Sequence, residues 1–204
     1  LKVGAILRIS KQLKIGAAVH TPTLYSMEET YSTNLTTHFD TVSIPGSSPY
    51  VGYFEYDLIT PWKAIVSAST IFNKNIIISA DYEIIDYTFS EMSSYDYAFE
   101  TENDAIKNTY TQAANIRLGA EVNVKPFVLR SGYSKYGSAL ANKDFSRENF
   151  SFGLGLNNGN YFFDVAYVLS QGMDEYKLYS DDYIAPISLV NTNHNLIFTL
   201  GFRY

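Results

Sequence analysis

The chain has 204 residues, a net charge of -6, no cysteine and 46% hydrophobic residues. The length suits one domain, and no run approaches the roughly 18 consecutive apolar residues that a membrane-spanning helix needs. The acidic balance gives no reason to expect a nucleic-acid partner, and the lack of cysteine excludes disulfides and thiolate metal sites.

Alternation of apolar and polar residues, the period of a β-strand, begins at the first residues of the chain. It predicts strands at 3–9 and 13–19, joined by a turn at 10–12, and the polar stretch 28–49 predicts a long loop. Alternation resumes at 54 and continues to 72, passing through Pro61 in register. This predicts one long strand that is bent or bulged at the proline.

After a tight turn at 73–75, a further strand begins at Ile76, and its apolar phase shifts after Ile85. The shift predicts a β-bulge near Ile84–Ile85. The polar segment 93–108 predicts a loop, because no segment of the chain shows a convincing helical period. The remaining alternating segments predict strands at 110–122, 127–134, 150–156, 161–170 and 193–204. The total is nine strands, and the first begins at the start of the sequence, so we expect a fragment that lacks its N-terminal part.

The connections between these strands alternate in length. Short ones fall at 10–12, 73–75, 124–126 and 157–160, and long ones fall at 28–49, 93–108, 138–147 and 171–191. Short periplasmic turns and longer extracellular loops are typical of outer-membrane β-barrels. The pattern therefore predicts an all-β fold, a transmembrane antiparallel up-and-down β-barrel in the bacterial outer membrane, with a periplasmic C-terminus. Bacterial barrels have even strand numbers and no open edge in lipid, so an odd count also favours a fragment.

The polar positions of the strands carry both charged residues and many glycines, such as Gly119 and Gly132. A water-facing sheet would not collect glycines, which weaken strands, whereas a crowded lumen needs small residues. We therefore interpret the polar face as the lumen and the apolar face as the lipid contact. The charged residues predict a lumen network that joins neighbouring strands, formed by Arg8, Lys14, Asp81, Glu83, Arg117, Glu121, Arg130, Asp164 and Arg203.

Aromatic residues gather near predicted strand ends, for example Phe54, Tyr56 and Phe127, which resembles the interfacial girdles of a barrel. General enrichment of aromatic residues in β proteins explains this pattern equally well. The last strand alternates up to a terminal aromatic residue, which resembles the signal read by the barrel-insertion machinery. The residues of this expected signal are Phe198, Leu200, Phe202 and Tyr204.

Several longer motifs, in this order, resemble the C-terminal part of the FadL-type outer-membrane transport family in its Bacteroidetes form. They are LKIGAAVHTPTLYSM (13–27), LITPWKAIVSASTIFNKNIIISADYEIIDYT (58–88), ANIRLGAEVNVKPFVLRSGYSKYG (114–137), FSFGLGLNNGNYFFDVAYV (150–168) and TLGFRY (199–204). The resemblance implies a fourteen-stranded barrel, of which this chain supplies the last nine strands. It also implies uptake of hydrophobic small molecules such as long-chain fatty acids. The family's N-terminal hatch and kinked gating strand have no counterpart in this sequence.

No signature of an enzyme is found in the sequence. The three histidines, His20, His38 and His194, lack the spacing of metal ligands, and no serine lies in a nucleophile elbow. Gly153 and Gly155 form only a GxG on a strand, without the helix that a phosphate-binding loop requires. We therefore expect no catalytic residue, no metal and no cofactor, and the sequence does not identify residues that bind a substrate.

These patterns predict a single β-barrel domain over 1–204, and the family resemblance implies that it passes hydrophobic small molecules through its lumen by passive diffusion. The expected partners are the lipid bilayer, a hydrophobic ligand, the barrel-insertion machinery and other outer-membrane proteins. Two alternatives remain open at this point. One is a barrel that acts as a scaffold or partner in a protein-export or surface complex, and the other is a soluble β-sandwich that serves as a binding module.

Overall fold

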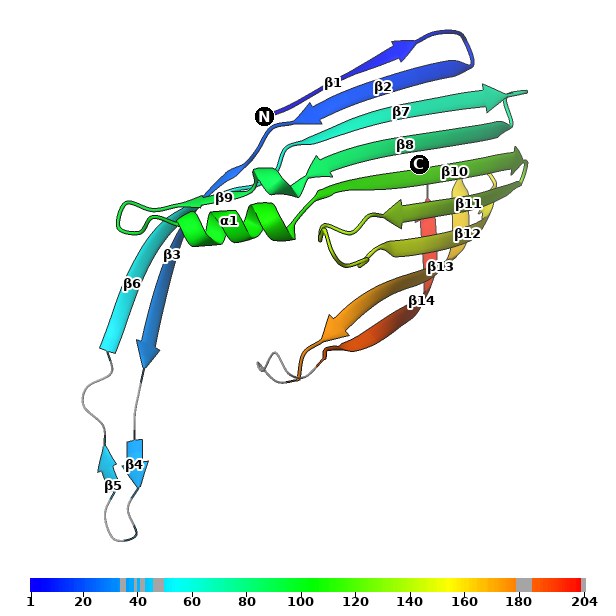
Figure 1. The fold of residues 1–204 in the computed structure, drawn as a ribbon. Coiled ribbons are helices and arrows are strands. Elements are labelled where there is room, and N and C mark those ends of the chain that lie inside the picture. The colour runs from blue at the N-terminus through cyan, green and yellow to red at the C-terminus, as the bar shows by residue number, and fades with distance from the viewer. Residues whose placement is uncertain (34–35, 39, 41–42, 46–49, 179–184, 203–204) are drawn as a thin grey trace.

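The computed structural model describes residues 1–33, 36–38, 40, 43–45, 50–178 and 185–202 (Figure 1). Within them lie strands, one α-helix and one 3-10 turn. The strands are β1 (Lys2–Arg8), β2 (Leu13–His20), β3 (Leu24–Thr33), β4 (Thr36–His38), β5 (Ser43–Pro45), β6 (Tyr50–Ile59), β7 (Lys63–Phe72), β8 (Ile76–Asp86), β9 (Glu91–Ser93), β10 (Gln112–Val124), β11 (Phe127–Tyr136), β12 (Arg147–Asn157), β13 (Tyr161–Tyr176) and β14 (Ile187–Phe202). The helix is α1 (Glu100–Thr109), and the 3-10 turn is η1 (Tyr87–Phe89).

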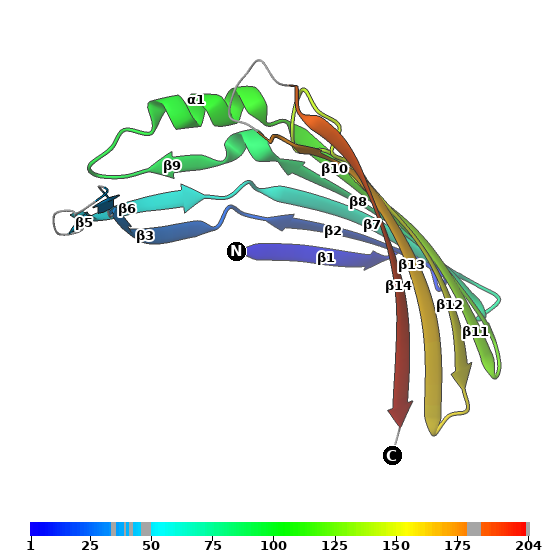
Figure 2. The same cartoon turned by 90° about the horizontal axis from the view of Figure 1, so that it is seen from below.

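The largest sheet of the described residues has nine strands in the order β1-β2-β7-β8-β10-β11-β12-β13-β14. Each strand pairs antiparallel with the next, which confirms the predicted all-β antiparallel sheet. The predicted total of nine strands is too low, because β3, β4, β5, β6 and β9 lie in two smaller sheets. The sheet is strongly curved (Figure 2). It is open in the described part of the chain, because β1 and β14 form its two edges, so the closure of a barrel stays a prediction.

All short turns lie at one end of this sheet and all long connections lie at the other (Figure 1). The turn after β7 places Asn73 and Lys74 at φ 46° and 63°, and the turn after β12 places Gly159 at φ 87°. Glycine adopts this left-handed conformation without the steric cost of a Cβ, which fits the tight β12–β13 turn. Phe202, the last described residue, pairs with Tyr161 beside this turn, so β14 ends where the short turns lie.

The predicted single strand 54–72 is wrong, because it consists of two strands that belong to different sheets. β7 lies in the nine-stranded sheet, whereas β6 pairs with β3 in a three-stranded sheet of order β3-β6-β9. Residues 60–62, which include Pro61, form no strand, as expected where proline cannot donate a ladder hydrogen bond. The predicted loop 28–49 is also wrong where it is described, since it contains the end of β3 and the short β4–β5 hairpin.

The predicted bulge near Ile84–Ile85 is wrong as well. β8 keeps an unbroken register with β10 up to the pair Gln112 and Asp86, and the strand then ends in η1. The Asp86 carboxylate accepts hydrogen bonds from the backbone N–H and the hydroxyl of Thr88, at 3.1 and 2.6 Å. The change of apolar phase therefore marks the end of the strand, where the carboxylate caps the turn.

The predicted loop 93–108 contains α1, so the expectation that the chain lacks a helix is wrong. Its first turn carries Glu100 and Glu102 and its last turn carries Lys107, an arrangement that complements the helix dipole. Among the described residues, no helix is long and apolar enough to cross a membrane. The connection predicted at 171–191 is shorter, because β13 extends to Tyr176 and β14 begins at Ile187, and 179–184 lie outside the described residues.

Candidate functional site

The nine-stranded sheet has one apolar face, which we define by the outward positions of its strands, such as Leu118, Leu154 and Phe198. These three side chains are 48%, 49% and 62% exposed. In the described part of the chain, no second sheet packs on this face. Soluble proteins rarely expose so large a continuous apolar surface, so this face requires a cover other than water.

Aromatic side chains border the apolar face at both ends of the strands. At the turn end lie Phe72, Phe127, Tyr161 and Phe202, and toward the loop end the rings of Tyr133 and Phe150 pack with centroids 5.0 Å apart. Two girdle candidates, Phe54 and Tyr56, are in β6 instead and pack against Phe99, away from this sheet. Their assignment to a girdle is therefore wrong, since the strand that carries them leaves the sheet.

The opposite face of the sheet is polar and crowded. A Cβ added to Gly16, Gly119 or Gly132 would lie 2.5, 2.9 or 2.6 Å from the hydroxyl of a serine on a neighbouring strand. Side chains converge in this way on the concave side of a curved sheet, where large residues have no room. The polar face is therefore the concave one, as a lumen would be.

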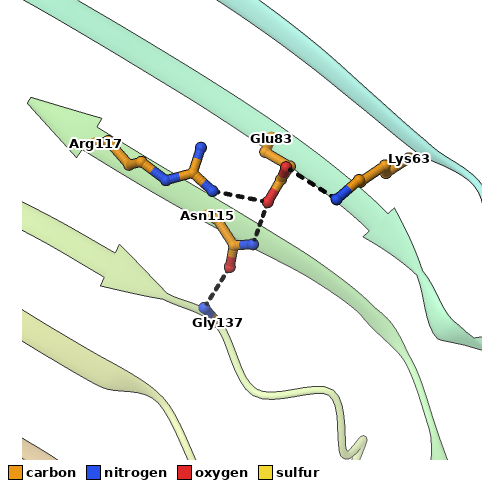
Figure 3. Close-up of polar contacts among 5 residues, drawn as sticks. All are labelled: Lys63, Glu83, Asn115, Arg117 and Gly137. Atoms are coloured by element: carbon orange, nitrogen blue, oxygen red, sulfur yellow. Dashed lines mark hydrogen bonds and ion pairs between the residues drawn. The ribbon is translucent and has the colours of Figure 1, made fainter. Parts of the chain in front are cut away.

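A first ion cluster lies on the polar face near the loop end, centred on Glu83 of β8 (Figure 3). One oxygen of its carboxylate accepts hydrogen bonds from Arg117, at 3.0 Å, and from the Asn115 amide, at 2.8 Å. The Lys63 ammonium lies 3.8 Å from the other oxygen, and the Asn115 carbonyl oxygen accepts from the Gly137 backbone N–H at 3.1 Å. The cluster thus joins β7, β8 and β10 to the segment that follows β11.

Glu83 is 5% exposed and is the most buried acidic residue of the described chain. A buried carboxylate is tolerated only when it is paired and hydrogen-bonded, and here it has two cations and one amide. The Arg117 guanidinium also lies 5.6 Å from the centre of the Tyr136 ring on β11. Arg117 therefore contacts both strands that flank its own.

A second ion cluster lies nearer the turn end of the polar face. Arg130 of β11 donates to Glu121 of β10 at 2.8 Å and to Asp164 of β13 at 2.7 Å. The bond to Asp164 crosses β12, because Arg130 pairs in register with Gly153 and Asp164 pairs with Gly155. Gly155 leaves the space in which the guanidinium meets the carboxylate of the far strand, because a Cβ there would collide with Asp164.

The structure thus brings five residues of the expected network into two separate clusters: Glu83 with Arg117, and Glu121 with Arg130 and Asp164. Arg8, Lys14 and Asp81 form no ion pair with these clusters among the described residues. Arg203 and Tyr204 lie outside the described residues. Phe198, Leu200 and Phe202 lie exposed on the apolar face, and their role in barrel insertion stays a prediction.

Sequence reasoning missed Lys63 and Asn115 as members of the first cluster. Both lie at polar positions of their strands, but only the pairing of Lys63 with Ile85 and of Asn115 with Glu83 places them near one carboxylate. Of the histidines, His194 bonds the Tyr167 hydroxyl at 2.7 Å, and the side chain of His38 lies outside the described residues. The described residues hold no cluster of metal-ligating side chains.

A shallow depression of about 670 Å³ lies on the apolar face above the second cluster. Its lining includes Ala120, Leu129, Phe152, Leu154 and Val165. An apolar hollow of this size on an outward face suits the acyl chain of a lipid.

No family model matches the sequence, and no curated protein sequence matches it. A search of solved structures finds similarity to the crystal structure of a FadL homologue from Pseudomonas aeruginosa, with a TM-score of 0.61 and 12% sequence identity. The match covers 98% of this chain and 50% of that one, so the chain spans about half the length of this neighbour. At this identity the similarity shows the fold, and it is consistent with the C-terminal part of a FadL-like protein.

Proposed function

We propose that the chain contributes its strands to an outer-membrane barrel that passes hydrophobic small molecules, such as long-chain fatty acids, through its lumen by passive diffusion. One observation carries the proposal: the curved sheet exposes a continuous apolar face and turns charged and small residues to its concave side. Acyl chains of a bilayer are the natural cover of such a face. The FadL-like fold supports the same assignment.

The two ion clusters suit a passage for apolar molecules, because their charges are already paired. Glu83 is held by Arg117 and Lys63, and Arg130 lies between two carboxylates. A paired charge offers a passing apolar molecule less uncompensated field than a lone charge would. Diffusion along the concave face needs no coupled energy source.

The fold disfavours a soluble β-sandwich, because a sandwich buries its apolar face against a second sheet and the described chain provides none. In the orientation that we propose, the short turns and the end of β14 lie in the periplasm and the long connections lie outside the cell.

A pair of neighbouring residues on β7 tests the proposal. Ser69 lies on the polar face and Ala68 on the apolar face, both at the middle of the strand. We expect Ser69→Trp to reduce uptake of a labelled long-chain fatty acid severalfold in cells that depend on this protein, whereas Ala68→Trp leaves uptake unchanged.

Both variants are compared at equal amounts in the outer-membrane fraction, so that a folding defect is recognised. Equal uptake by the two variants and the unaltered protein would contradict a lumen passage. Recovery of the unaltered protein in the soluble fraction would contradict the membrane assignment itself.

A further inference from the structure

Beyond the nine-stranded sheet, the long connections build a separate projection, which we call the arm and define as residues 21–62 and 87–109 (Figure 1). It has its own packed centre. Phe99 is 7% exposed, and its ring lies 5.9 Å from that of Phe54, 5.8 Å from Tyr56 and 4.9 Å from Tyr97, measured between centroids. Aromatic pairs at these distances stabilise the arm as a folded unit.

Hydrogen bonds reinforce this unit. The Tyr56 hydroxyl donates to Glu29 at 2.9 Å, and the Tyr97 hydroxyl donates to Glu102 of α1 at 3.0 Å. Donation to a carboxylate stabilises the protonated phenol, so the pKa of both tyrosines is raised. The arm is therefore a built surface that holds its side chains in defined positions.

The charge of the arm differs sharply from that of the remaining chain. The arm holds ten acidic residues, which are Glu28, Glu29, Asp40, Glu55, Asp57, Glu91, Asp96, Glu100, Glu102 and Asp104.

 These ten acidic side chains share the arm with a single basic one, Lys107. The remaining residues of the chain hold 14 of the 15 basic side chains and 11 of the 21 acidic ones. The negative charge of the protein is thus concentrated in the arm, which favours a cationic partner.

The arm also presents an unpaired sheet edge. Among the described residues, β3 pairs with β6 on one side only, and all ten of its residues are exposed. The Thr60 backbone N–H donates to the Thr23 carbonyl at 2.9 Å, which makes this pair a hydrogen-bonded one. Because such pairs alternate along an antiparallel ladder, the backbone groups of Ser26, Glu28 and Thr30 point away from β6. They are free to bond another strand.

Acidic side chains lie beside this edge. Glu28 of β3 stands directly opposite Glu55 of β6, an arrangement of like charges that destabilises a strand pair. The two residues line a cavity of about 450 Å³ together with Asp57 and Asp96. None of these four carboxylates forms an ion pair within the described residues. A cation placed here from another molecule would offset the repulsion.

We propose that the free edge of β3 binds an extended, lysine- or arginine-bearing segment of another protein as an additional strand. The backbone of Ser26, Glu28 and Thr30 supplies the hydrogen bonds, and the two carboxylates of Glu28 and Glu55 together attract a cation on the added strand near Glu28. This docking role goes beyond the proposed passage of apolar molecules, and each can hold without the other.

The test uses a fluorescent peptide of alternating lysine and valine, as long as the ten residues of β3, and the protein in detergent micelles. Fluorescence anisotropy measures its affinity. We expect binding that weakens as ionic strength rises from about 0.02 M to about 0.3 M, where screening shortens the reach of charges. A peptide of the same sequence with methylated backbone nitrogens lacks the donors for a β ladder, so it should not bind.

Substitutions distinguish binding at the β3 edge from general electrostatic attraction to the acidic arm. Glu28→Gln combined with Glu55→Gln should weaken binding by about fivefold, because it removes the cross-strand partner of an added cation at Glu28 and the second negative charge that stands behind it on β6. The control, Glu100→Gln combined with Asp104→Asn, removes two exposed charges from α1 and should change affinity by less than about twofold, since those charges lie away from the edge. Thr30→Pro should abolish binding, because it removes an outward donor while leaving the β3–β6 bonds in place.

Three results would overturn the proposal. The first is no measurable binding of the peptide. The second is an equal loss of affinity in the two charge variants, which would show that the peptide is attracted to acidic charge anywhere on the arm and does not bind at the edge of β3. The third is slow hydrogen exchange at Ser26, Glu28 and Thr30 in the protein without peptide, which would show that another part of the same protein already covers the edge. If Thr30→Pro does not fold, the paired charge variants and the exchange measurement still decide.

Discussion

At the scale of single residues, Gly155 explains how an ion pair spans three strands. A Cβ at this position would collide with the Asp164 carboxylate and would lie 3.4 Å from the Arg130 guanidinium, whereas a Cβ at Gly153 meets only ordinary contacts, the nearest at 3.6 Å. The absence of a side chain at Gly155 therefore permits the bond between Arg130 and Asp164.

We predict that Gly155→Ala breaks this ion pair and lowers the free energy of unfolding by about 1 kcal/mol, a small value because Arg130 is nearly half exposed. Gly153→Ala is the matched control, and it should be neutral or slightly stabilising, since glycine weakens a strand. Thermal unfolding in detergent, followed by circular dichroism, compares the two. An equal loss in both variants would contradict the role assigned to Gly155.

Glu83 is the second residue whose removal should be costly. Glu83→Gln keeps an acceptor for the Asn115 amide but leaves Arg117 and Lys63 without their counter-charge, so we expect a loss of about 1–3 kcal/mol in unfolding free energy. Asp81→Asn changes a nearby acid of the same strand that forms no ion pair among the described residues, and it should cost less than about 0.5 kcal/mol. Urea unfolding of the two variants in micelles measures the difference, and a costlier Asp81→Asn would refute the ranking.

Much of the charged set could be predicted from the sequence, but its partners could not. Period-two alternation places Glu83, Arg117 and Arg130 on one face, yet the pairs depend on the register of neighbouring strands. The contact between Arg130 and Asp164 also needs a glycine, Gly155, on the strand between them, which only the fold brings into line. The sequence therefore predicts which charged residues lie on the polar face, whereas the grouping into two ion clusters is seen only in the structure.

At the scale of elements, the strands of the large sheet were predictable because each keeps a clean alternation between short turns. The arm was not. The adjacent Glu28 and Glu29 hide the alternation of β3, and α1 carries too few apolar residues to show a helical period. Its acidic first turn and Lys107 in its last turn were the readable signs of a helix. Tertiary packing on Phe99 supplies what the local pattern lacks.

The packing of the arm leads to a prediction at this scale. Phe99→Ala removes the ring that contacts Phe54, Tyr56 and Tyr97, and we expect the arm to lose about 2–4 kcal/mol of local stability. Limited proteolysis should then cleave within the arm while the nine-stranded sheet stays resistant. Tyr95→Ala, at a fully exposed neighbouring position, is the control and should not change the cleavage pattern. Cleavage that is equal in both variants would contradict a packed arm.

At the scale of the whole molecule, the protein has two chemically distinct parts. The curved sheet carries an apolar outer face and paired charges on its concave side, and the arm carries most of the uncompensated negative charge beyond the strand ends. The role proposed for the curved sheet depends on lipid covering its apolar face. If water or a second protein layer covered it, the polar face would no longer be a lumen.

Spin labels attached at single introduced cysteines test this claim most directly, and the sequence contains no native cysteine to interfere. With the protein in lipid vesicles, labels replacing Leu118, Leu154 and Phe198 should be accessible to oxygen, which dissolves in the bilayer, and protected from a water-soluble nickel reagent. Labels at Ser67, Ser151 and Thr199, which lie on the polar face, should show the opposite preference. The account predicts this alternation with a period of two residues. Accessibility of both sets to the water-soluble reagent, or no difference between them, would contradict it.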